Sequence, residues 1–152
     1  MQETTKKPSL STAASLLLKP TTLLAIVRGK SHAQGPAAYT NARDSVVAMH
    51  EAGIPILAGT DCHEEPSSMF DVKHGESIHR ELDLLVEAGL SPVEALCAAT
   101  SLPAKHFSLN DRGVIADGKR ADLVLLKDDP TKDIRATRSI SRIWCNGRAV
   151  GV

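Results

Sequence analysis

Aromatic residues are scarce in this chain, which has one Tyr, one Trp and two Phe among its 152 residues. Proteins that bind single-stranded nucleic acid stack the bases on aromatic side chains, so this scarcity argues against a binding platform of that kind. Charge of one sign is also lacking, because 18 basic residues balance 18 acidic residues. No net field attracts nucleic acid or an anionic membrane surface, and we expect neither as a partner.

Cysteine is limited to Cys62, Cys97 and Cys145, an odd and widely spaced set without a C-x-x-C pair or a disulfide framework. A reducing, cytoplasmic setting is the simpler interpretation.

Long apolar runs are missing as well. Lys19 and Arg28 bracket the run 23–27, which falls far short of the roughly 20 apolar residues that a membrane span needs. The patch 10–18 follows two lysines as in a signal peptide, but Lys19 and Pro20 interrupt it early, so we do not expect export.

What is present is the composition of a globular protein, with 42% hydrophobic and 24% charged residues. Residues 1–36 show neither helical nor strand periodicity and form a poorly defined leader. From Ala38 onward, apolar residues recur at helical spacing until Gly53, which predicts an amphipathic helix. The apolar run 54–58 that follows predicts a strand buried on both faces, as in a parallel sheet.

The next stretch predicts two further helices. Apolar residues repeat at helical spacing between Ile78 and Val86, the polar residues that include Glu81 lie largely on the other side, and Gly89 ends this helix. Ser91, Pro92 and Glu94 then supply an N-cap, a first-turn proline and a capping box.

Beyond Leu109 the periodicity changes to short strands separated by turns. The run 121–126 predicts a strand, and Asn146-Gly147 predicts a hairpin turn between 143–145 and 149–150. An α/β part is therefore followed by a small all-β part, with the change near residues 109–113.

Asp61 is the first candidate for chemistry. It follows the predicted strand 54–58, and in parallel α/β folds the residues after the carboxyl ends of strands line the active site. The alternative is that Asp61 is only a turn or N-cap residue. Its position alone leaves both interpretations open.

Several motifs, in the same order along the chain, resemble the carboxy-terminal part of the amidohydrolase superfamily. Within that superfamily they are most similar to the imidazolonepropionase-like and prolidase-like members. They are AGIPILAGTD at 52–61, HREL at 79–82, EAGLSP at 87–92, EAL at 94–96, AAT at 98–100, GVIADGKRADLVLL at 113–126 and NGR at 146–148. Together they cover about residues 38–150.

The resemblance implies an α/β fold made of the carboxy-terminal slice of a (β/α)8 TIM-type barrel, followed by part of a small β-sandwich. Residues 1–36 would be the leader, 37–109 the end of the barrel and 110–152 the sandwich segment. It further implies that Asp61 binds a divalent metal, first of all Zn²⁺, and accepts a proton from the attacking water.

The chain departs from the family in its metal ligands. A catalytic zinc usually takes three protein ligands, yet the six histidines include no His-x-His pair. A complete barrel takes about 250 residues, whereas only 60 precede Asp61. We therefore expect one ligand of a site whose other ligands lie elsewhere, and an isolated chain that is inactive.

Other polar residues near Asp61 are weaker candidates. His63 and His74 are candidate substrate-binding residues, and for His63 the alternative is a solvated loop histidine. Cys62 has no identifiable base nearby in the sequence, which favours a small buried residue over a reactive thiol. Asp122 resembles a structural residue of the family, and we assign it no chemistry.

The sequence thus predicts part of a metal-dependent hydrolase that acts on the carbon–nitrogen bond of a small amide, cyclic amide or dipeptide. The alternatives are a non-catalytic binding or assembly module and one half of a split enzyme. In each case we expect association through uncovered edges of the barrel slice.

Overall fold

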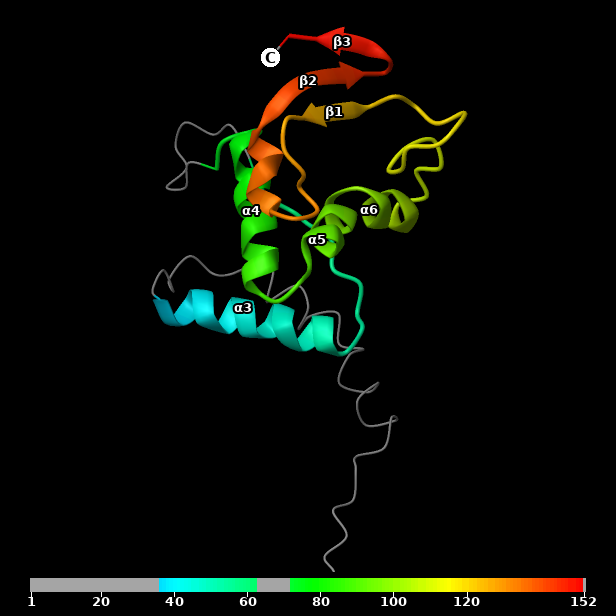
Figure 1. The fold of residues 1–152 in the computed structure, drawn as a ribbon. Helices are drawn as coiled ribbons and strands as arrows, with labels where there is room; N and C mark the ends of the chain where they lie inside the picture. The colour runs from blue at the N-terminus through cyan, green and yellow to red at the C-terminus, as the bar shows by residue number, and fades with distance from the viewer. Residues whose placement is uncertain (1–35, 63–71, 152) are drawn as a thin grey trace, which may run out of the picture. The chain divides into compact units, whose positions relative to one another are not determined.

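A computed structural model describes residues 36–62 and 72–151 of the chain. Contacts between residues divide the chain into two units, residues 1–42 and 43–152. The boundary falls inside the first described helix, α3 (Pro36–Glu51). The fold is mixed α/β, with helices first and a small antiparallel sheet after them (Figure 1).

Glycines end two of the helices, α3 and α4 (Glu76–Glu87), as the sequence predicts. Gly53 and Gly89 have φ of +69° and +102°, the left-handed region that glycine enters at little cost. In both helices the N–H groups of the glycine and of the residue after it donate to carbonyls of the last turn, at 2.9 to 3.2 Å. These bonds form Schellman motifs, which satisfy the last carbonyls and stop the helix.

The predicted capping box opens α5 (Pro92–Ala99). The Glu94 N–H donates to Ser91 Oγ at 3.2 Å, and the Ser91 N–H donates to Glu94 Oε2 at 2.7 Å. Each side chain thus satisfies a backbone donor that the helix cannot pair. A short helix, α6 (Ser101–His106), follows directly.

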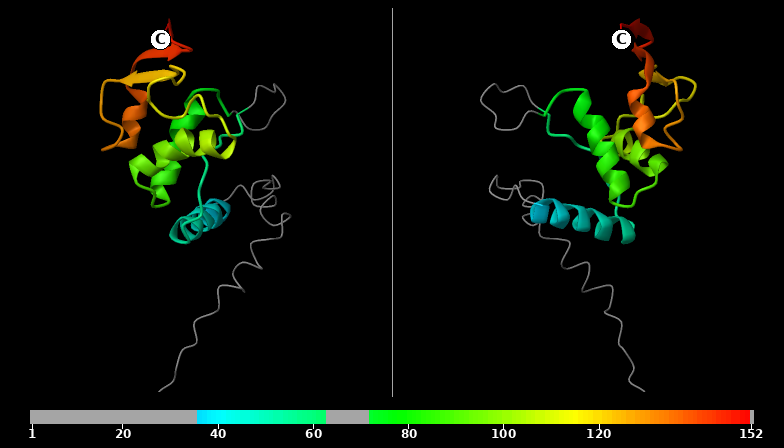
Figure 2. Two further views of the ribbon diagram at one scale, coloured as in Figure 1. Left: turned by 90° about the vertical axis from the view of Figure 1, so that its right-hand side faces the viewer. Right: turned by 60° about the vertical axis from the view of Figure 1, so that its left-hand side comes forward.

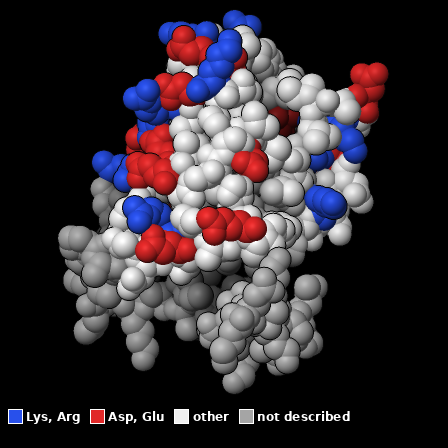
Figure 3. Space-filling model, turned by 60° about the horizontal axis from the view of Figure 1, so that its bottom comes forward, with Lys and Arg blue, Asp and Glu red and all other residues white. Residues whose placement is uncertain are grey.

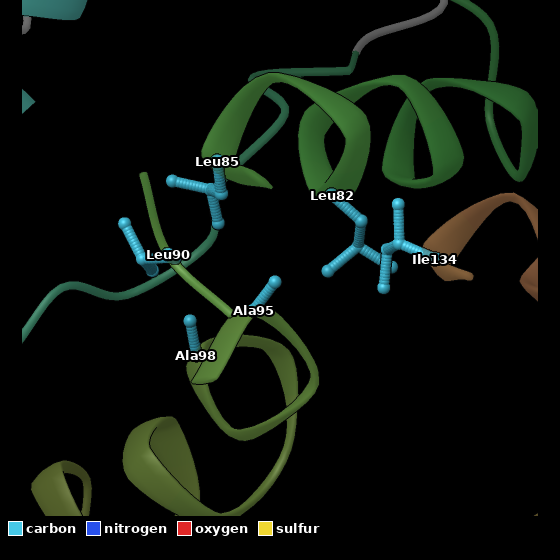
Figure 4. Packing of buried hydrophobic residues seen from close by; sticks show 6 residues of the cluster. All are labelled: Leu82, Leu85, Leu90, Ala95, Ala98 and Ile134. Carbon is cyan, nitrogen blue, oxygen red and sulfur yellow. The ribbon is translucent and has the colours of Figure 1, made fainter. Parts of the chain in front are cut away.

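The core lies where α4, α5 and the 3₁₀ helix η1 (Ile134–Arg138) meet (Figure 4). Ala95 and Ala98 of α5 are fully buried, and their small side chains let the neighbouring elements approach closely. Ile134 of η1 lies beside Leu82 of α4 in Figure 4. The complete cluster is Leu82, Leu85, Leu90, Ala95, Ala98 and Ile134.

The sheet has three antiparallel strands in the order β1 (Leu123–Leu126), β2 (Ile140–Cys145) and β3 (Arg148–Val150). The hairpin between β2 and β3 turns at Asn146 and Gly147, whose φ values are +50° and +76°. Positive φ at both central residues is the geometry of a type I′ turn. The predicted strand and hairpin are confirmed.

The prediction of a strand at 54–58 is wrong. These residues are extended, but the described part of the chain gives them no neighbouring strand. The Ala58 N–H instead donates to the Ala98 carbonyl of α5 at 2.9 Å. A β-strand requires a neighbouring strand whose backbone groups pair with its own, and here a backbone carbonyl of a helix accepts the hydrogen bond instead.

Polar contacts join η1 to α4, which lie side by side in Figures 1 and 2. His79 Nδ1 lies 3.0 Å from the Thr137 hydroxyl, and Thr137 is buried. Arg138 Nη2 donates to Asp83 Oδ2 at 2.9 Å. These contacts and Ile134 together fix the start of the β part against the helices.

Charge is mixed on the face shown in Figure 3, where basic and acidic side chains alternate instead of gathering by sign. Across residues 36–62 and 72–151, none of the helices combines the length and the apolarity that a membrane crossing requires.

Candidate functional site

Asp61 lies at the end of the extended segment 54–60, where the sequence predicts it, and it is exposed. Its φ of +51° is left-handed, a conformation that aspartate adopts more readily than most residues. The Cys62 N–H donates to the Thr60 hydroxyl at 3.3 Å, across Asp61.

Two helices hold the backbone just before Asp61. The Ala58 N–H is bound by the carbonyl of Ala98 in α5, and the Gly59 N–H donates to Glu81 Oε1 of α4 at 3.3 Å. Burial raises the pKa of the Glu81 carboxyl, and the hydrogen bond from Gly59 lowers that pKa in part.

Glu81 was expected largely on the polar side of α4. In the structure it reaches the candidate site, and its spacing could have shown this. It follows Ile78 by three residues and precedes Leu85 by four, which places it within the apolar stripe of the helix.

Cys62 has a base beside it, contrary to the sequence-based expectation. Cys62 Sγ lies 3.3 Å from His74 Nδ1, Cys62 is half-buried and His74 is exposed. Twelve residues separate the two in sequence, and no local pattern predicts the contact. A thiol paired with an imidazole can donate or accept a hydrogen bond, depending on the tautomer of the ring.

The described residues do not fit a metal ion by themselves. Within 36–62 and 72–151, no three His, Cys, Asp or Glu side chains are grouped so that they could hold one. A catalytic zinc site usually needs three protein ligands. Within the described residues, Asp61 is therefore not part of a group of three ligands that could hold a metal ion.

The other predicted site residues have different outcomes. His63 lies outside the described residues, and so do the neighbouring Glu64 and Glu65. His74 is described and lies beside the residue that follows Asp61, but no contact in the structure tests whether it binds substrate.

Asp122, for which we expected a structural role, makes structural contacts. Asp122 Oδ1 accepts the Asn146 N–H at 2.7 Å, and Asp122 also pairs with Arg120. The hydrogen bond from Asn146 is the main reason that the pKa of the Asp122 carboxyl is lowered, followed by Arg120. His50 Nε2 lies 3.2 Å from Glu94 Oε1.

Comparison with known proteins gives a match to the Amidohydrolase family over residues 34–150. An imidazolonepropionase from Deinococcus deserti is 35% identical over 104 residues, covering 66% of this chain and 25% of its own length. An adenine deaminase from Methanoregula boonei is 38% identical over 82 residues, covering 54% of this chain and 14% of its own length.

Among solved structures, a Xaa-Pro dipeptidase with bound methionine in its active site is similar. It has a TM-score of 0.63 and 28% sequence identity, and the match covers 73% of this chain and 26% of the dipeptidase chain. The chain thus spans about a quarter or less of the length of these relatives.

Proposed function

Because the chain belongs to the amidohydrolase family, we propose that it is the carboxy-terminal part of a hydrolase that cleaves a carbon–nitrogen bond of a small amide, cyclic amide or dipeptide. The names of its relatives support this class of reaction, since a deaminase and a dipeptidase both act at carbon–nitrogen bonds. This chain matches about a quarter or less of the length of these relatives, and the activity of a whole enzyme of this class depends on the rest of its length as well.

The proposed architecture is the last portion of a (β/α)8 barrel over 37–109, followed by part of a β-sandwich over 110–152. Two features support it. The segment 54–60 precedes α4 and α5 in the chain and is hydrogen-bonded to both helices through the Ala58 and Gly59 N–H groups, in the order in which a barrel segment precedes its covering helices. The three-stranded sheet follows as a separate antiparallel layer.

The single observation that carries the proposed chemistry is the exposed carboxylate of Asp61 at the end of this segment. In our proposal Asp61 accepts the proton of the attacking water, because a carboxylate placed at the reacting oxygen acts as a general base. A divalent metal, first of all Zn²⁺, would take Asp61 as one ligand and its remaining ligands from residues outside the described ranges. We assign His63 and His74 to the substrate side of the same site.

A chimera tests this role. Residues 34–150, which match the family, would replace the corresponding part of the Deinococcus deserti imidazolonepropionase, and turnover of that enzyme's own substrate would be measured. We expect Asp61→Asn to lower the rate by at least about 100-fold, the scale of a lost general base. The control Asp117→Asn changes an exposed turn residue and should leave the rate within about twofold. A chimera that tolerates Asp61→Asn equally well would refute the proposal.

A second candidate is a binding or assembly module without catalysis. Apolar side chains exposed on the sheet favour it, since Val124, Leu125 and Val150 are 55%, 51% and 42% exposed. The test is to assay residues 1–152 alone for zinc content and for hydrolysis of amides, dipeptides and cyclic amides. Stoichiometric zinc with turnover that Asp61→Asn abolishes would exclude this candidate.

The proposed enzyme could also be assembled from two polypeptides, with this chain as one of them. A partner that copurifies with the chain and restores turnover would support such a split enzyme. Turnover by residues 1–152 without any partner would exclude it.

A further inference from the structure

Glu81 is the side chain that connects helix α4 to the backbone before Asp61. Its Oε1 atom accepts the Gly59 N–H at 3.3 Å, although 22 residues separate the two in sequence. Gly59 is two residues before Asp61, so this hydrogen bond acts on the end of the segment that carries the candidate carboxylate.

The position of Glu81 is unfavourable for a charge. Burial raises the pKa of its carboxyl, which means that the fold opposes the ionised form. Its neighbours on the same stripe of α4 are Ile78 and Leu85, which contribute to the core or pack against it. An apolar residue here would extend that core, so packing alone does not account for a carboxylate at position 81.

A second hydrogen bond ties the segment to another helix, α5. The Ala58 N–H is bound by the Ala98 carbonyl of α5, and the next N–H, that of Gly59, is bound by Glu81 of α4. The segment is therefore hydrogen-bonded to both helices immediately before Asp61.

We propose that Glu81 is a positioning residue for Asp61: by accepting the Gly59 N–H it holds the end of the segment against α4 and thereby sets the direction of the Asp61 carboxylate. The inference rests on the function proposed for Asp61, but its physical content is the order of residues 59–62. Glu81 acts through the backbone and need not contact substrate.

The test uses the full 152-residue chain and measures amide hydrogen exchange residue by residue. Glu81→Gln keeps an acceptor oxygen of nearly the same size, whereas Glu81→Leu removes the acceptor and keeps the volume. We expect the leucine variant to speed exchange at Gly59 about tenfold, the factor that corresponds to about 1.4 kcal/mol. The glutamine variant should stay within about twofold of the unaltered chain.

Two controls separate positioning from a general loss of stability. Exchange at Ala95 and Ala98, in the core, should not change in either variant if the effect is local. Glu87→Leu removes an exposed carboxylate of the same helix that pairs with Arg80, and it should leave Gly59 unaffected. Unchanged exchange at Gly59 in Glu81→Leu, or equal acceleration in the leucine and glutamine variants, would overturn the proposal.

If Glu81→Leu does not fold, the unaltered chain decides the question. The Gly59 amide proton should shift with pH in step with the carboxyl carbon of Glu81, because the hydrogen bond strengthens when its acceptor ionises. An amide shift that does not follow that carboxyl overturns the proposal.

The Asp61 chimera separates this inference from the function on which it rests. Local loosening by Glu81→Leu in a protein whose turnover tolerates Asp61→Asn would keep the positioning contact and reject the function. If turnover is sensitive to Asp61→Asn but Glu81→Leu has no effect on exchange at Gly59, the function is kept and the positioning role of Glu81 is rejected.

Discussion

Among the glycines of the described residues, Gly113 is the one at which an added methyl group should be most costly. Its φ is +88°, and a Cβ built on it would lie 2.4 Å from the Cβ of Ala104, 2.9 Å from the Thr100 carbonyl oxygen and 3.4 Å from the Cα of Ser101. Ala104 is buried, and the other two atoms belong to the backbone where α5 meets α6. None of these neighbours is the end of a flexible side chain that could move aside.

Two terms set the expected effect of Gly113→Ala. Forcing an alanine into left-handed backbone costs about 1–2 kcal/mol, and overpacking a well-filled contact costs about 1–3 kcal/mol. We therefore expect the free energy of unfolding to fall by about 2–5 kcal/mol.

Gly118→Ala is the matched control. Gly118 has a similar φ of +78°, but nothing lies within 4 Å of its added Cβ. This variant should show only the backbone cost of about 1–2 kcal/mol. The assay is urea unfolding of residues 1–152 followed by far-ultraviolet circular dichroism. Equal losses in the two variants would show that the close approach of Gly113 to α6 does not exist in solution.

Two further predictions concern the start of α5. Ser91→Ala removes the hydroxyl that accepts the Glu94 N–H and should lower the free energy of unfolding by about 1 kcal/mol. The control Ser141→Ala, at an exposed strand position, should change the free energy of unfolding by less than about 0.5 kcal/mol. Equal effects of the two variants in urea unfolding would contradict the cap. Hydrogen bonds from the Ser91 side chain, the Ser91 backbone and His50 lower the pKa of the Glu94 carboxyl to about 2 from its ordinary 4.5. A carboxyl whose pKa is lower in the folded than in the unfolded chain stabilises the fold above the unfolded pKa, and this contribution is lost as pH falls. The Tm advantage of the unaltered chain over Glu94→Gln should therefore shrink between about pH 4.5 and about pH 2. An advantage that grows on acidification would refute this prediction.

Local interactions explain why much of the helical part could be predicted. Gly53, Gly89 and the Ser91–Glu94 pair act on residues no more than five positions away, and each ends or begins a helix in the structure as expected. Asn146-Gly147 is equally local, because the turn type follows from the φ values that these two residues tolerate.

Interactions between distant residues explain what could not be predicted. An apolar run such as 54–58 becomes a strand only if another strand pairs with it, and its own residues carry no information about that partner. The contact of Cys62 with His74 and that of Gly59 with Glu81 span 12 and 22 residues. Only the spacing of Glu81 from Ile78 and Leu85 gave a local sign of the second contact.

Ile134 has a consequence for how such a chain can change over generations. Composition divides the chain near residue 110, yet Ile134 lies on the far side of that division and fills the helical core, while Arg138 binds Asp83 of α4. Recombination at residue 110 would separate the helices from a side chain on which their packing depends. A viable exchange of the sheet must therefore bring an apolar residue at position 134 that packs against the resident Leu82, so the two parts are coupled although composition separates them.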